Sequence, residues 1–176
     1  QPGEVAVTKI GARIRTSVVA TQTDDARSEE CYNVIGFIPG IGAQTESGTG
    51  RGLNSQVIVV HAYYDGLGVG PDGTLYAGAN DNASGVATML EMARVLNHGP
   101  YQPKKTVVFV AWTGGERGET LSVRDVMNAK LGFSSLTVEA VIELSGVGAG
   151  DGDGIALGDG SSHRLVQLYQ GAAGRA

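Results

Sequence analysis

The stretch GANDNASGVATMLEMARVL, residues 78–96, decides the fold of this chain of 176 residues. Its second half carries apolar residues at the spacing of one helix face: Val86, Met89, Leu90, Ala93 and Leu96. We predict an amphipathic helix over 83–96, with Asn82 or Ser84 as its N-cap and the Gly-Pro pair at 99–100 as its stop.

Apolar runs lie on both sides of this helix. They cover residues 56–62 (QVIVVHA), 106–112 (TVVFVAW) and 138–144 (VEAVIEL). Such runs are typical of central strands that are covered on both faces in a parallel sheet. Weaker helical patterns at 121–130 and 161–173 complete a β-α-β-α-β-α alternation. The fold class that we predict is α/β, a three-layer sandwich with a mixed, mostly parallel central sheet and right-handed crossovers.

The N-terminal part has a different pattern. Residues 5–10 and 12–21 are rich in β-branched residues and predict a hairpin or meander at a sheet edge. Another strand is expected at 32–38, and the Gly/Ser/Thr-rich insertion at 41–55 is expected to be a loop without a strand. We expect residues 1–176 to form one domain, and the start at Gln1 without Met suggests an excised or truncated part of a larger chain.

Composition and charge exclude several classes of function. The net charge is -5, and Lys104-Lys105 is the only basic cluster, so we expect no binding to nucleic acid. No apolar run approaches the ~20 residues of a membrane-spanning helix, so we expect no membrane insertion in this segment. The single cysteine, Cys31, has no partner for an internal disulfide and is interpreted as a small packed residue.

Acidic residues follow the predicted strands. Asp65 comes after the run 56–62, Asp81 opens the crossover segment, and Glu116 comes after the run 106–112. Ligands of open α/β sheets bind beyond the carboxyl ends of the strands, so these three carboxylates are expected at one edge. Converging carboxylates need protons or cations to neutralise them, and a metal ion such as zinc is one solution.

Three motifs together resemble a known family. They are DGLG at 65–68, GANDNASG at 78–85 and TVVFVAWTGGE at 106–116. The chain resembles, over roughly residues 32–148, the zinc aminopeptidases with two co-catalytic metal ions. That family also includes bacterial leucyl aminopeptidases and the ectodomains of the transferrin receptor and glutamate carboxypeptidase.

The resemblance assigns two metal ligands. Asp81 matches the aspartate that bridges both metals, and Glu116 matches a zinc ligand. Each has a simpler interpretation: Asp81 caps the following helix, and Glu116 pairs at the surface with Arg117 or Arg124.

Of the other positions that the resemblance marks, 63, 115 and 145 have changed residue type, whereas Asp65 is kept. Tyr63 stands where the family has a zinc-binding histidine, and Asp65 stands where the family's aspartate orients that histidine. Gly115 occupies the position of the general base. Glycine has no group that accepts a proton from water, so the ~10²–10⁴-fold increase in rate that a general base provides is lost there. Ser145 replaces an aspartate that ligates the second zinc.

Three further residues are possible replacements. His61 and Glu143 share strand faces with positions 63 and 145, and we considered both as substitute ligands. The family's last ligand is a histidine far downstream, whereas His163 is interpreted as a surface residue near a helix start.

Other motifs carry weaker hypotheses. GVGAG at 146–150 continues as DGDG, which does not begin a helix as a dinucleotide-binding turn must, and the aspartates at 151, 153 and 159 lack the EF-hand spacing. Ser145 lacks the nucleophile-elbow pattern because Glu143 stands where glycine belongs. Tyr63, Tyr64 and Trp112 belong either to the core or to a peptide-binding cleft.

We therefore predict a pseudoenzyme: an aminopeptidase-like domain without catalysis that serves as a binding or structural module, with weak or absent zinc. The alternative is an active zinc aminopeptidase that hydrolyses N-terminal residues of peptides with atypical ligands or with residues outside this chain. A peptide or a protein is the expected partner. The resemblance and the missing start suggest an extracytoplasmic location, in the periplasm or at the cell surface of a bacterium.

Overall fold

The computed structural model describes residues 15–20, 30–42, 52–117, 137–148 and 167. The strand predicted at 5–10 and the helix predicted at 121–130 lie outside these residues. Of the helix predicted at 161–173, residue 167 alone is described, and it is helical. Within the described parts of the chain, no helix combines the length and the apolar character that a membrane crossing requires.

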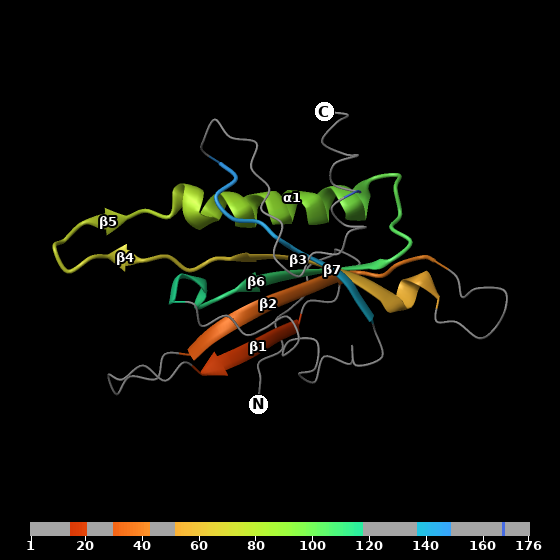
Figure 1. Cartoon of the computed structure of the whole chain (residues 1–176), viewed down its shortest axis with the longest axis horizontal. Helices are drawn as coiled ribbons and strands as arrows, with labels where there is room; N and C mark the ends of the chain where they lie inside the picture. The colour runs from red at the N-terminus through yellow and green to blue at the C-terminus, as the bar shows by residue number, and fades with distance from the viewer. Residues whose placement is uncertain (1–14, 21–29, 43–51, 118–136, 149–166, 168–176) are drawn as a thin grey trace.

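The main sheet has five strands in the order β1-β2-β6-β3-β7 (Figure 1). The pair β3 and β6 and the pair β3 and β7 are parallel, whereas β2 is antiparallel to both β1 and β6. Four of the five strands therefore run in one direction, which confirms a mixed, mostly parallel sheet. The strands are β1 (Arg15–Ala20), β2 (Glu30–Ile38), β3 (Gln56–Tyr63), β6 (Thr106–Trp112) and β7 (Thr137–Glu143).

The connections carry short helices and one small hairpin. β3 is followed by the antiparallel pair β4 (Gly68–Val69) and β5 (Leu75–Tyr76), then by η2 (Ala79–Ser84) and α1 (Gly85–His98). The short helices η1 (Leu53–Ser55) and η3 (Gly115–Arg117) precede β3 and follow β6. Figure 1 shows α1 running along one face of the sheet and the β4–β5 hairpin extending past the end of β3.

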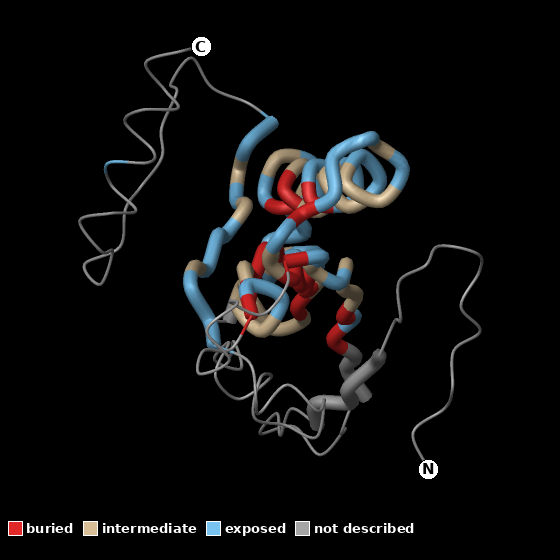
Figure 2. Tube along the Cα trace, turned by 90° about the vertical axis from the view of Figure 1, so that its right-hand side faces the viewer, coloured by how far each residue is buried: buried red, intermediate tan, exposed pale blue. Residues whose placement is uncertain are grey.

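Two apolar clusters form the core, one on each face of β3 and β6. One joins β2, β3 and β6 through Ile35, Val57, Val59, Val108, Val110 and Trp112. The other packs α1 on the sheet through Val60, Ala62, Met89, Val107 and Phe109. Figure 2 shows the buried residues gathered in the strands beneath α1. Side chains alternate between the faces of a strand, so a continuous apolar run supplies both clusters.

Most strand limits agree with the predictions. β6 matches the predicted run 106–112, and β3 extends one residue beyond the predicted 56–62. The prediction that 138–144 is a central, doubly covered strand is wrong for the described residues, because β7 ends the strand order and is largely exposed. The β4–β5 hairpin was not predicted, since each of its strands has two residues and gives no periodic signal.

One of the two predicted N-cap residues of α1 is confirmed. Ser84 holds the cap position but makes no side-chain bond to the backbone N–H groups of the first turn. Its hydroxyl donates instead to the carbonyl of Asn80, at 2.6 Å. The side chain of Asn82 bonds outside the helix, so neither predicted residue makes a side-chain cap bond in α1.

Met89 anchors α1 to the sheet, and its truncation tests this packing. Met89 is 3% exposed, whereas its neighbour Leu90 is 62% exposed. We expect Met89→Ala to lower the free energy of unfolding by about 2–4 kcal/mol, because it leaves a cavity between α1 and the sheet. The matched control Leu90→Ala is expected to change it by less than about 0.5 kcal/mol in urea denaturation. Equal losses for the two variants would contradict this placement of α1.

Candidate functional site

The ends of β3, β6 and β7 meet the start of η2 at one edge of the sheet. We call this place the carboxyl-end corner and define it by Tyr63, Asp81, Gly115, Glu116 and Ser145. The sequence predicted this edge as the functional one, since ligands of open α/β sheets bind beyond the carboxyl ends of strands.

The side chain of Asn82 holds the corner together. It is 1% exposed, and its Nδ2 donates to the carbonyl of Tyr63 at 3.2 Å and to the carbonyl of Leu144 at 2.8 Å. Its Oδ1 accepts from the backbone N–H of Gly146 at 3.2 Å. One carboxamide thus joins the ends of two parallel strands to the segment that leads into α1.

Asn80 and Gly85 complete this arrangement. Asn80 Oδ1 accepts from the backbone N–H of Gly148 at 2.9 Å, so the two asparagines hold the turn after β7. A Cβ on Gly85 would overlap both the Asn82 amide and the Leu144 carbonyl oxygen. Asn80, Asn82 and Gly85 of the GANDNASG element therefore serve close packing between strand ends, a role that was not predicted from the sequence.

Tyr63, Asp81 and Ser145 form a hydrogen-bonded group. The Tyr63 hydroxyl donates to Asp81 Oδ1, and it lies 3.2 Å from Ser145 Oγ, which itself lies 3.5 Å from Asp81 Oδ1. Burial raises the pKa of Tyr63, and its hydrogen bond to Asp81 and the negative charges of Asp81 and Glu116 raise it further. The phenol therefore stays protonated at neutral pH and acts as a donor to Asp81.

Asp65 binds the loop that follows β6. Its Oδ1 accepts from the backbone N–H of Gly115 at 3.0 Å, and its Oδ2 accepts from that of Glu116 at 3.3 Å. The three predicted carboxylates lie at the same edge, but in the described residues no group of three His, Cys, Asp or Glu side chains gathers as metal ligands do.

The two substitute ligands that we considered, His61 and Glu143, are register partners on β3 and β7. The ring of His61 packs edge to face against Trp112, with 5.8 Å between ring centroids. Its Nδ1 is buried and has no hydrogen-bond partner among the described residues. A ligand role for either residue stays a prediction.

A family comparison identifies the chain. The sequence profile of peptidase family M28 matches residues 41–176. The chain belongs to peptidase family M28. A probable zinc metalloprotease of the fungus Pyrenophora tritici-repentis is 42% identical over 71 residues, which are 40% of this chain and 15% of that protein. The zinc aminopeptidase resemblance of the sequence is thereby confirmed at the level of the family.

Solved structures support the M28 fold. A Zn-dependent exopeptidase from Parabacteroides distasonis superimposes with a TM-score of 0.56 and 19% identity over 81% of this chain and 50% of that one. Glutaminyl cyclase from an Acidobacteriales bacterium gives a TM-score of 0.64 and 22% identity over 93% and 53%. The chain thus spans about half the length of these structures. The curated relatives are fungal and these neighbours are bacterial, so a bacterial source stays a prediction.

The donor atoms at the corner do not fit the two-zinc centre that the family resemblance implies. Catalytic zinc takes three protein ligands, mostly nitrogen or sulfur with some carboxylate oxygen, and keeps one position for water. Asp81 accepts the Tyr63 hydroxyl, and both oxygens of Asp65 accept backbone N–H groups. Glu116 remains as a carboxylate and Ser145 as a neutral hydroxyl, while His163 lies outside the described residues.

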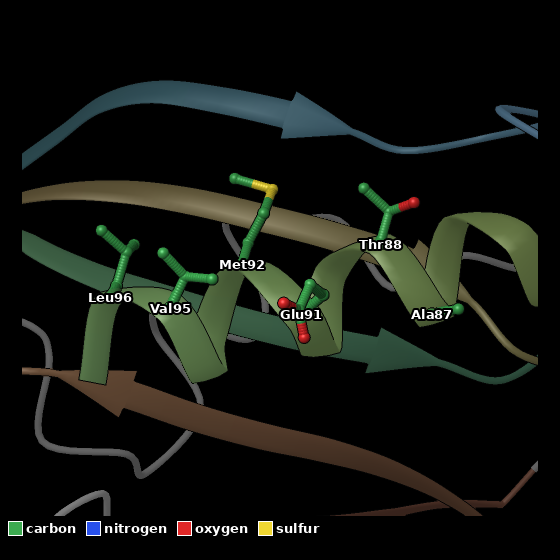
Figure 3. Close-up of a pocket in the computed structure, with 6 residues that line it drawn as sticks. All are labelled: Ala87, Thr88, Glu91, Met92, Val95 and Leu96. Atoms are coloured by element: carbon green, nitrogen blue, oxygen red, sulfur yellow. The ribbon is translucent and has the colours of Figure 1, made fainter. Parts of the chain in front are cut away.

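Two hollows are lined by residues other than Tyr63, Asp81 and Ser145. A cleft of about 280 Å³ beside the β4–β5 hairpin is lined by Tyr64, Asp65, Tyr76 and the backbone near Gly78. Trp112, by contrast, is a core residue at 2% exposure, which settles its assignment. A larger groove of about 540 Å³ is lined by residues of α1 alone (Figure 3). They are Ala87, Thr88, Glu91, Met92, Val95 and Leu96.

The role of Asn82 can be tested by substitution. Asn82→Ala removes three hydrogen bonds from a buried position, so we expect a loss of about 2–4 kcal/mol in the free energy of unfolding. Asn80→Ala is the matched control, because its side chain makes one bond in a more exposed place, and we expect a loss under about 1 kcal/mol. Urea denaturation measures both losses. A loss under about 1 kcal/mol for Asn82→Ala would show that its side chain does not hold the corner together.

His61 is expected to make stability depend on pH. Burial lowers the pKa of His61, and the charge of Glu143 offsets part of this by raising it. The unfolded chain takes up this proton below about pH 6.5 while the folded chain resists it. The stabilising contribution is therefore present above about pH 6.5 and is lost as the pH falls through the lowered pKa of the folded state.

His61→Phe is expected to flatten the fall in melting temperature between about pH 7 and about pH 5. Glu143→Gln is expected to steepen it, because this variant removes the charge that raises the pKa of His61. Thermal melts across this range measure both, and an unchanged slope in His61→Phe would show that another group controls the acid sensitivity.

Proposed function

We propose that this M28 domain does not hydrolyse peptides and serves as a binding or structural module. The observation that carries the proposal is the occupation of the carboxyl-end corner by the chain's own hydrogen bonds. The Tyr63 hydroxyl donates to Asp81, and position 115 holds glycine. A metal-bound water at this place would have neither a full ligand set nor a base to take its proton.

Asp81 and Glu116 are the residues that would hold a zinc ion most directly if one bound. Asp81 lies in η2 and accepts the Tyr63 hydroxyl, and Glu116 lies in η3 after β6 at the same corner. Two carboxylates bind zinc more weakly than a set of three or four protein ligands that includes histidine. We therefore propose that zinc, if present at all, is weakly bound.

The cleft beside the β4–β5 hairpin supports a binding role. Tyr64 and Tyr76 are about half exposed there, and the neighbouring glycines leave backbone groups within reach of a ligand. Tyrosine presents an apolar ring and a polar hydroxyl, a combination that suits peptide or protein partners. We propose such a partner for this cleft and an extracytoplasmic location for the domain.

An active zinc aminopeptidase is the second candidate. Its support is the retention of both Asp81 and Glu116 at one corner, together with the zinc metalloproteases among the relatives. In that case, residues outside the described part of this chain, or outside the chain itself, complete the site.

A hydrolysis assay separates the two candidates. We expect the chain, incubated with excess zinc, to hydrolyse aminoacyl-anilides and short peptides no faster than its Glu116→Ala variant. The absence of a base at position 115 alone predicts a loss of about 10²–10⁴-fold relative to an intact site. Zinc titration by calorimetry is expected to show fewer than two tight sites per chain.

Hydrolysis clearly above the Glu116→Ala control, together with two tightly bound zinc ions, would establish the second candidate instead. An Asp72→Ala variant serves as a control for the loss of a carboxylate elsewhere. Its side chain bonds Thr74 in the hairpin turn and lies outside the corner.

A further inference from the structure

Gly115 lies against the side chain of Tyr63. A Cβ built on Gly115 would overlap the Tyr63 Cβ and lie 2.5 Å from its Cγ, far inside the ordinary contact distance of about 3.5–4.0 Å. The Tyr63 Cβ is bonded to the backbone, so no change of side-chain rotamer moves it away from position 115. The loop and the strand end can therefore approach this closely only because residue 115 has no side chain.

The loop cannot easily move away from Tyr63. Both oxygens of Asp65 accept backbone N–H groups of this loop, from residues 115 and 116. The backbone N–H of Thr113 donates to the Oδ1 of Asn33, which is 1% exposed, at 3.0 Å. Two hydrogen bonds to Asp65, just after β3, and one to Asn33 of β2 therefore hold the loop.

We infer that Tyr63 and Gly115 form an interlocked pair, with Asp65 as the positioning residue that keeps the loop against Tyr63. Tyr63 fills the space beside position 115, so its side chain leaves no room there for the acidic residue that the family resemblance implies. A single substitution at 115 cannot place a carboxylate there without displacing the loop. This inference deepens the proposed function, since it rests on the same corner and explains why one change cannot restore a base.

A double-mutant cycle on the whole 176-residue chain tests the interlock. We expect Gly115→Ala to lower the melting temperature by about 3–8 °C, because overpacking forces the loop to shift. In a Tyr63→Gly background, the same substitution is expected to change it by less than about 2 °C. A Tyr63→Ala background is expected to keep most of the penalty, because the overlapping Cβ atom is still present.

Gly114→Ala is the matched control within the same loop. Gly114 has a φ of 81°, so alanine is strained there whatever occupies position 63. We expect Gly114→Ala to lower the melting temperature equally in the wild-type and Tyr63→Gly backgrounds. The interlock is supported if the effect of Gly115→Ala depends on the residue at position 63 while the effect of Gly114→Ala does not.

Asp65→Asn provides a second test of the contact between Tyr63 and Gly115. Asparagine loses one acceptor, so the loop is held less tightly and the penalty of Gly115→Ala is expected to fall by at least about half. If Gly115→Ala alone does not fold, recovery of a cooperative melting transition in the Tyr63→Gly or Asp65→Asn background supports the interlock in the same way.

A Gly115→Ala variant as stable as the wild type, or one whose penalty is the same in the wild-type, Tyr63→Gly and Asp65→Asn backgrounds, overturns the inference. These outcomes are distinct from those of the hydrolysis assay. Hydrolysis by the wild-type chain overturns the proposed function without changing the cycle, and an additive cycle overturns the interlock without changing the assay.

Discussion

The carboxamide of Asn82 supports the geometry on which the rest of the carboxyl-end corner depends. Parallel strands are linked by long crossovers, so no tight turn fixes the ends of β3 and β7 relative to each other. Asn82 supplies that link by donating to a carbonyl at the end of each strand and by accepting from the turn after β7. Asp81, the preceding residue, is thereby held beside Tyr63 and Ser145.

The carboxylates at this corner are stabilised by donors from the chain itself. Asp81 receives the Tyr63 hydroxyl, and Asp65 receives two backbone N–H groups. Carboxylates that lie close together repel one another unless protons, cations or hydrogen-bond donors stabilise them. Hydrogen-bond donors of the chain stabilise Asp81 and Asp65 in this way. Both oxygens of Asp65 and the Oδ1 of Asp81 therefore accept hydrogen bonds from the chain itself.

Membership of peptidase family M28 and the proposed absence of catalysis are compatible, because a fold and its active site are separable. The residues that match the family, 41–176, include β3, α1, β6, β7 and the GANDNASG element. The chemistry depends instead on a few side chains at strand ends, which can change without loss of the core. Tyr63, Gly115 and Ser145 are positions of this second kind.

The sequence alone determined the limits of β6, the helix at α1, the mixed α/β sheet and the edge at which Asp65, Asp81 and Glu116 lie. These features follow from local patterns, namely apolar runs, helical spacing and the place where a strand ends. Only the tertiary structure decided the exposure of β7, the bonds of Asn82 and the contact of Tyr63 with Gly115. Each of these depends on which segments, far apart in the chain, lie next to one another in the fold. A local sequence pattern does not specify these neighbours.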